Sequence, residues 1–114
     1  MPKDDLVYTG HMLDMARKAV EMVAGMERAE FDADEVLHMA LAHTIQIVGE
    51  AASRVSQEYQ HRHARIPWRA IIGMRHKIVH DYMNLKEDVL WDVVMQDLQP
   101  LIAMLEKIVP AEEA

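Results

Sequence analysis

The stretch that decides the fold is residues 87–108, EDVLWDVVMQDLQPLIAMLEKI, in which apolar side chains recur every three or four positions. This spacing predicts an amphipathic helix with one apolar stripe facing a protein core. Pro100 lies inside the pattern and predicts a kink, because proline lacks the backbone donor and crowds the preceding turn. Asn84 and Glu87 have the spacing of a capping box and predict where this helix begins.

Two longer helices are predicted upstream. Residues from about 4 to 26 carry a second apolar stripe of helical period, and the acidic stretch 27–34 indicates a turn. Asp32 and Glu35 are spaced as a capping box that opens the next helix, which we expect to fray near Tyr59.

A short helix completes the expected set. Residues 60–66 are polar and without apolar period, which indicates a loop. Pro67 suits the first position of a helix that ends near His80, with Trp68 as an anchor. The sequence therefore predicts an all-α protein, a small up-and-down bundle of four main helices with one of them short, forming a single domain over residues 1–114.

The composition bounds the class of protein. Hydrophobic residues make up 51% of the 114 residues and charged residues 27%, which are ordinary values for a globular chain. The absence of cysteine excludes a disulfide scaffold, thiolate catalysis and zinc fingers that use cysteine. Charged residues near the N-terminus do not fit a signal peptide, and no apolar run is long enough for a membrane span. We therefore expect a soluble, cytoplasmic protein, which at this size would gain stability from a partner subunit.

The net charge of −7 is unevenly distributed. Residues 54–77 contain six basic side chains and one acidic one, Glu58, so this basic segment carries +5 and the rest of the chain −12. A local excess of this kind indicates an anion site on an acidic body. An exposed basic loop without a ligand explains it equally well.

The run Arg75-His76-Lys77-Ile78-Val79-His80-Asp81-Tyr82 ends the basic segment and suits phosphodiester chemistry. A histidine near its ordinary pKa of about 6.5 can accept or donate a proton at neutral pH. An arginine pairs with two phosphate oxygens and stays charged as the transition state gains negative charge. RNA supplies its own nucleophile, the 2′-hydroxyl, so the reaction requires no metal.

Geometry restricts this hypothesis. Arg75 and His80 lie about 140° apart on an ideal helix, whereas Arg75 and Tyr82 share a face. A working site therefore needs the helix to end near His80, or a second subunit related by a twofold axis. The alternative is a basic helix face with a packed histidine. Glu50 is either a buried partner of Arg75 or an exposed glutamate, and the sequence leaves both open.

A metal site is the second candidate. His76 and His80 are four positions apart on one helix face, with His61 or His63 as a possible third ligand. The neighbouring cations oppose a divalent metal, so we expect none. The histidines of the two long upstream helices are predicted to be packed or exposed rather than functional: His11, His38 and His43.

The motif Arg75-x4-His80-x-Tyr82 resembles the Arg-x4-His-x-Tyr signature of the HEPN superfamily, and specifically of its HepT branch. The resemblance covers essentially the whole chain. Matching segments recur in the same order and at similar spacing: Ile47-Val48-Gly49-Glu50-Ala51-Ala52, Ile66-Pro67-Trp68, Gly73-Met74-Arg75 and Val89-Leu90-Trp91.

This resemblance implies an all-helical homodimer with the motif along a cleft between protomers. HepT-like proteins are metal-independent endoribonuclease toxins, and their antitoxin is a minimal nucleotidyltransferase that can attach AMP to the motif tyrosine. By position, Arg75 would stabilise the phosphate charge, and His80 would transfer the proton of the 2′-hydroxyl. Tyr82 would place the RNA and receive AMP. No cofactor is implied.

Further residues would contact RNA under the same resemblance, namely Arg65, Arg69, His76 and Lys77. His76 departs from the family pattern, in which a polar residue, often asparagine, follows the arginine, so its part in acid–base chemistry stays open. The main competing hypothesis is a non-catalytic RNA- or nucleotide-binding partner of a nucleotidyltransferase. A helical dimerisation domain without a ligand is the third.

Overall fold

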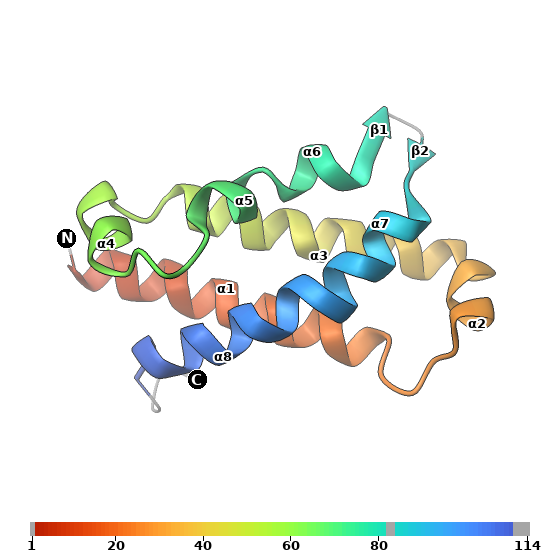
Figure 1. Cartoon of the computed structure of the whole chain (residues 1–114), viewed down its shortest axis with the longest axis horizontal. Helices are drawn as coiled ribbons and strands as arrows, with labels where there is room; N and C mark the ends of the chain where they lie inside the picture. Colours follow the sequence, from red (N-terminus) through yellow and green to blue (C-terminus); the bar gives the residue numbers. More distant parts are fainter. Residues whose placement is uncertain (1, 82–83, 111–114) are drawn as a thin grey trace.

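Two long antiparallel helices form the frame of the protein. In the computed structural model, which describes residues 2–81 and 84–110, α1 (Pro2–Met22) and α3 (Glu35–Ser53) lie side by side (Figure 1). Small buried side chains on both helices, among them Ala16 and Ala52, allow the close approach. The prediction of an all-α fold is confirmed, and the molecule measures 42 × 28 × 20 Å.

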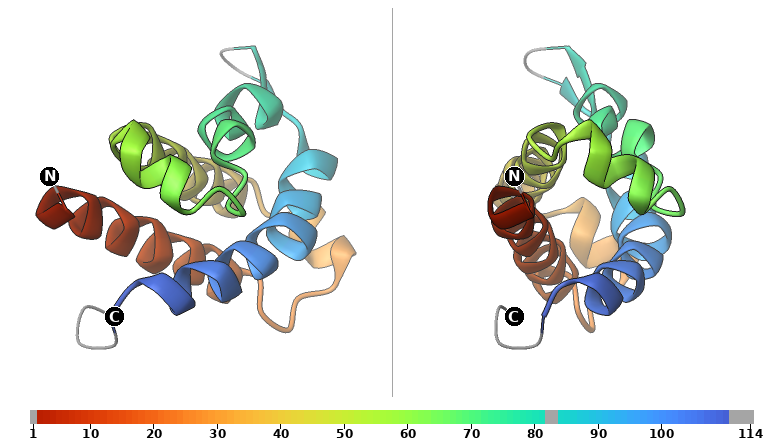
Figure 2. Two further views of the ribbon diagram at one scale, coloured as in Figure 1. Left: turned by 60° about the vertical axis from the view of Figure 1, so that its left-hand side comes forward. Right: turned by 90° about the vertical axis from the view of Figure 1, so that its left-hand side faces the viewer.

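The C-terminal helical stretch closes the core from the other side. α7 (Glu87–Asp92), the π-helix η1 (Val93–Asp97) and α8 (Leu98–Ile108) follow one another without a loop, and α8 packs on α1. In the end-on view of Figure 2, α1, α3, α8 and the segment between α3 and α7 surround a common interior. The stripe predicted for this region is confirmed, because its apolar residues are buried: Leu90, Val93, Val94, Leu98, Leu101 and Leu105.

The irregularity expected at Pro100 lies one turn earlier. Pro100 is the third residue of α8 and is exposed, and the wide turn of η1 directly precedes α8. Proline cannot donate a hydrogen bond to the carbonyl of Gln96, and the backbone widens in the turn that contains Gln96.

The connection between α1 and α3 differs from the prediction. Residues 27–34 are not a simple turn, because they contain the short helix α2 (Arg28–Asp32), which is opened by a capping box of Glu27 and Glu30. The predicted start of the next helix at Asp32 was wrong. Asp34 caps α3 instead, and its carboxylate accepts a hydrogen bond from the Leu37 backbone N–H at 3.0 Å. Several acidic residues here can cap a helix, and burial of Phe31 holds α2 in place.

The second long helix ends earlier than expected. α3 stops at Ser53, and a separate helix, α4 (Gln57–Arg62), occupies part of the predicted loop 60–66. Ser56 caps α4 by accepting a hydrogen bond from the Tyr59 N–H at 3.2 Å. The Ser56 N–H and hydroxyl both donate to the buried carboxylate of Asp5 in α1, at 2.8 and 2.7 Å. This contact with α1 fixes the new helix start.

The short helix predicted from Pro67 to His80 is divided into three pieces. Pro67 is the N-cap of α5 (Trp68–Ile72) rather than its first residue, and Gly73 separates α5 from α6 (Met74–Ile78). The chain then forms strand β1 (Val79–Asp81). A glycine and a β-branched valine, both poor helix formers, mark the two breaks.

A two-stranded antiparallel ribbon, which the sequence did not predict, projects from the helices. β1 pairs with β2 (Asn84–Leu85), and the Lys86 N–H donates to the Ile78 carbonyl at 3.0 Å (Figure 1). The capping box predicted from Asn84 to Glu87 was wrong, because Asn84 belongs to β2 and Lys86 is the N-cap of α7. Pairing across the ribbon satisfies backbone groups that a cap would otherwise have satisfied.

Candidate functional site

The short helix α6 carries three consecutive basic side chains. Met74 and Ile78 are buried and anchor this helix, whereas Arg75, His76 and Lys77 between them are exposed. The two apolar residues are four positions apart and therefore occupy one face. The intervening side chains must point to solvent, which leaves a guanidinium and an imidazole available to an anionic ligand.

The helix that carries Arg75 ends at Ile78, two residues before His80. A helix end near His80 was the geometric condition for Arg75 and His80 to serve one site, and the backbone meets it. His80 lies in β1; its side chain, and the whole of Tyr82, fall outside the described residues.

Lys77 makes one ion pair. Its Nζ lies 3.2 Å from Oδ2 of Asp97 in η1, and both side chains are solvent-accessible. An exposed pair of this kind contributes little to stability, so a phosphate group can replace the carboxylate as the partner of Lys77.

The remaining basic candidates lie in different places. Arg69 is exposed on α5, and Arg65 lines a cavity against the end of α8, together with Lys107. Lys107 is outside the basic segment, so charge counting along the sequence did not detect it. Glu50 is exposed, which excludes the hypothesis of a buried partner for Arg75.

Residues 2–81 and 84–110 contain neither a metal-binding cluster nor a membrane-spanning helix. Within these ranges, no cluster of three or more histidine, cysteine, aspartate or glutamate side chains could hold a metal ion. No helix there has the length and apolar character needed to cross a membrane.

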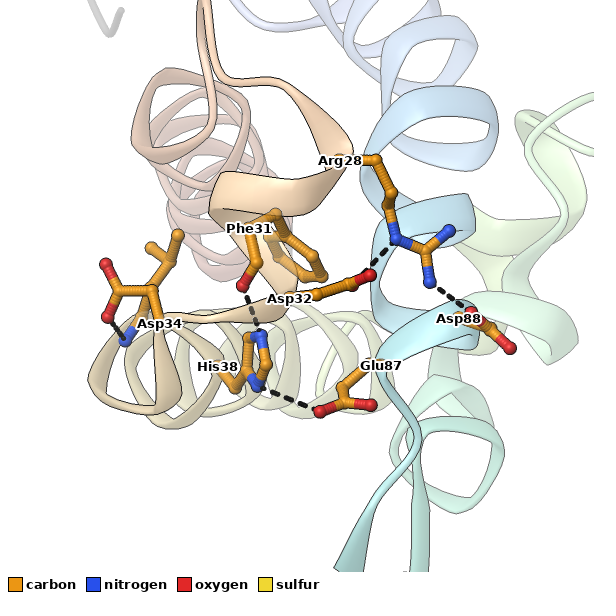
Figure 3. Close-up of polar contacts among 8 residues, drawn as sticks. Arg28, Phe31, Asp32, Asp34, His38, Glu87 and Asp88 are labelled. Atoms are coloured by element: carbon orange, nitrogen blue, oxygen red, sulfur yellow. Dashed lines mark hydrogen bonds and ion pairs between the residues drawn. The ribbon is translucent and has the colours of Figure 1, made fainter.

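Polar contacts link the start of α7, which follows the ribbon, to α2 and α3 (Figure 3). His38 is buried in α3, with Nε2 2.6 Å from the Phe31 carbonyl oxygen and Nδ1 3.8 Å from a carboxylate oxygen of Glu87. Arg28 of α2 pairs with Asp88 at the start of α7. His38 is packed, which is one of the two environments predicted for it, and its link to α7 was not apparent from the sequence.

Comparison with known proteins identifies the family. The family described as Ribonuclease HepT-like matches residues 12–108, which extend from α1 to the end of α8. This chain belongs to the HepT-like ribonucleases. The resemblance to the HepT branch of the HEPN superfamily is thereby confirmed, and the match includes Arg75 and His80.

Curated relatives of this HepT-like chain carry ribonuclease names. A protein of Thermococcus cleftensis named "Probable ribonuclease HepT" is 29% identical over 105 residues, covering 89% of this chain and 94% of the relative. A candidate RNase of Caldanaerobacter subterraneus subsp. tengcongensis is 28% identical over 106 residues, covering 93% and 95%. No solved structure gave a significant match.

Proposed function

We propose that this protein is a metal-independent endoribonuclease of the HEPN type that acts as the toxin of a toxin–antitoxin pair. The observation that carries the proposal is the HepT-like match over residues 12–108, which includes Arg75 and His80. The exposure of Arg75 next to the end of α6 gives the guanidinium access to a polyanion.

The reaction uses the nucleophile of the RNA itself. His80 accepts the proton of a 2′-hydroxyl, whose oxygen forms a bond to the adjacent phosphorus. Arg75 binds the non-bridging phosphate oxygens as they gain negative charge. The bond from phosphorus to the 5′-oxygen breaks, and that oxygen takes up a proton, which gives a 2′,3′-cyclic phosphate and a 5′-hydroxyl. Tyr82 places the RNA strand.

Neighbouring basic residues hold the RNA backbone. His76 and Lys77 share α6 with Arg75, and Arg69 is exposed on α5, which directly precedes it. Arg65 contributes from the loop before α5. Together they concentrate positive charge on α5, α6 and the loop before them, on a chain whose net charge is −7, and that limits where RNA can bind.

A homodimer would bring two copies of the motif together. Val36 and Met39 on α3 leave 77% and 66% of their surface exposed and, three positions apart, share one face of the helix. They flank His38, whose ring reaches Glu87 just after the ribbon. A second copy packed on this part of α3 would therefore lie near β1, the strand of His80.

The partner proposed to control the toxin is a minimal nucleotidyltransferase antitoxin, which would transfer AMP from ATP to the Tyr82 hydroxyl in the cytoplasm. The Tyr82 oxygen would lose its proton and form a bond to the α-phosphorus of ATP as pyrophosphate leaves. A bulky anion on Tyr82 would repel the RNA backbone near Arg75. This explains how one modification can inhibit cleavage without unfolding the toxin.

The first test is cleavage of RNA by the purified chain in the presence of EDTA. We expect cyclic phosphate ends, and loss of cleavage in His80→Ala at unchanged RNA affinity. His43→Ala, which removes an exposed histidine from α3, is the matched control and should cleave normally. Equal cleavage by His80→Ala and the parent would contradict the assignment of His80.

The second test concerns the antitoxin. Intact mass after co-expression with a nucleotidyltransferase should show added AMP units on the parent chain and none on Tyr82→Phe. Tyr8→Phe, on α1, should be modified like the parent. RNA binding without cleavage in every variant would instead indicate a non-catalytic partner of the nucleotidyltransferase.

A further inference from the structure

A basic cavity lies at the end of the molecule where α8 finishes. It has a volume of about 400 Å³ and is bounded by the segment from α4 to α5 and by the last turns of α8. Four of its lining side chains are basic: Arg62, His63, Arg65 and Lys107. None of the described lining residues is acidic.

The cations of this cavity are available to a ligand. Arg65 and Lys107 form no ion pair with any residue in 2–81 or 84–110. Arg62 pairs with Glu58 at 3.4 Å, but both side chains are largely exposed. Glu106, the neighbour of Lys107, pairs at 2.7 Å with Arg17 of α1. The closest acidic neighbour of Lys107 in sequence is therefore already neutralised.

The remaining lining is mainly apolar. Ile66 is buried beneath the cavity, and Met104 and Ile108 of α8 are partly exposed. Cations around an apolar floor fit an anionic ligand that also carries apolar surface, as a nucleotide does with its phosphate and its base.

This cavity continues towards the candidate site. A second cavity of about 260 Å³ lies between α5, α6 and α8, and Lys77 and Asp97 belong to its lining. Met104 lines both cavities and is a wall that they share. The two cavities follow one another along η1 and α8 between Asp97 and Lys107, over about 15 Å at 1.5 Å per helical residue, and we call this strip of surface the groove.

We propose that this groove binds a single strand of RNA that extends from Lys77, two residues after Arg75 on α6, to Lys107. The proposal rests on the ribonuclease function proposed above. A path of this length spans about four phosphates at the roughly 3.4 Å axial spacing that one strand has in a duplex. Lys77 and the cations around Lys107 mark its two ends, and the acidic surface elsewhere confines the strand to it. Arg65 thus acts with Lys107 rather than beside Arg75.

The test is the salt dependence of RNA binding, measured by fluorescence anisotropy with a 20-nucleotide single-stranded RNA. All proteins carry His80→Ala so that the RNA stays intact. Each contact with a phosphate of single-stranded RNA contributes about 0.7 to the slope of log affinity against log salt. Adding Arg65→Ala and Lys107→Ala should therefore reduce the slope by about 1.4, while Arg65→Lys with Lys107→Arg should restore it.

Lys18→Ala is the matched control, because Lys18 is an exposed cation on α1 that lines neither cavity. It should leave the slope unchanged. An unchanged slope in the protein with Arg65→Ala and Lys107→Ala would overturn the groove. This conclusion would hold even if the parent chain, which retains His80, cleaves RNA normally. Loss of antitoxin binding at an unchanged RNA slope would make the groove a protein interface. Absence of RNA binding in every protein would overturn the groove. Cleavage of RNA by the chain that retains His80 would decide separately on the ribonuclease function.

Discussion

Replacing Gly49 with alanine tests how closely α3 and α5 approach each other. Gly49 is buried in α3, and a Cβ atom at this position would lie 3.0 Å from the carbonyl oxygen of Ile71 and 3.4 Å from that of Ile72. Both oxygens belong to the backbone of α5, so neither can move aside as a flexible side chain would. The substitution must displace α5 or bend α3.

Two opposing effects determine how much Gly49→Ala changes the free energy of unfolding. Alanine in a helix interior is favoured over glycine by about 1 kcal/mol. Overpacking a close contact costs about 1–3 kcal/mol. Gly49→Ala should therefore lower the free energy of unfolding by up to about 2 kcal/mol. Gly10→Ala is the matched control, because Gly10 lies in α1 and a Cβ there meets nothing within 4 Å. It should stabilise the protein by about 1 kcal/mol.

Urea unfolding of the parent and both variants measures these values. The difference between the two variants isolates the contact with α5 and should be about 1–3 kcal/mol. Because Gly73 alone separates α6 from α5, a displaced α5 should also move Arg75 and slow RNA cleavage in Gly49→Ala alone. Equal stabilisation by the two substitutions would refute the close packing described here.

Three further predictions follow from individual contacts. Burial raises the pKa of Asp5, but hydrogen bonds from the backbone and hydroxyl of Ser56 outweigh it and leave the pKa below its ordinary value. The ionised carboxylate therefore stabilises the fold above about pH 4. Its contribution to the free energy of unfolding is lost as the pH falls through the lower pKa that Asp5 has in the folded state. Urea unfolding at several pH values should show this acid loss in the parent and a smaller one in Asp5→Asn. His38→Ala should cost about 2–4 kcal/mol in thermal or urea unfolding, because it removes a buried ring and its hydrogen bond to Phe31; a neutral effect would contradict the packing of α2 on α3. Arg75→Lys should reduce RNA cleavage roughly 100-fold or more with unchanged melting temperature, since the guanidinium is exposed and its proposed partner is the phosphate; cleavage at the parental rate would exclude that role.

Helical periodicity predicted the large elements well, because a long helix buries one stripe whatever it packs against. The stripes of α1, α3 and α8 are visible in the sequence and are buried in the structure. The motif from Arg75 to His80 is equally local, so its resemblance to HepT needed no structure. Local caps were less predictable. Asp32 and Asp34 are both adequate N-caps, and only the packing of α2 selects Asp34.

The sequence by itself thus determined the all-α class, the long helices and the family, and it supplied the candidate residues for phosphodiester chemistry. Tertiary structure decided which of these residues share a surface. It ended α6 at Ile78 by pairing the ribbon, and it brought Lys107 of α8 to Arg65 across the cavity. The physical reason is that periodicity and charge counting report neighbours along the chain. Arg65 and Lys107 line the same cavity only because α8 packs against the segment between α4 and α5.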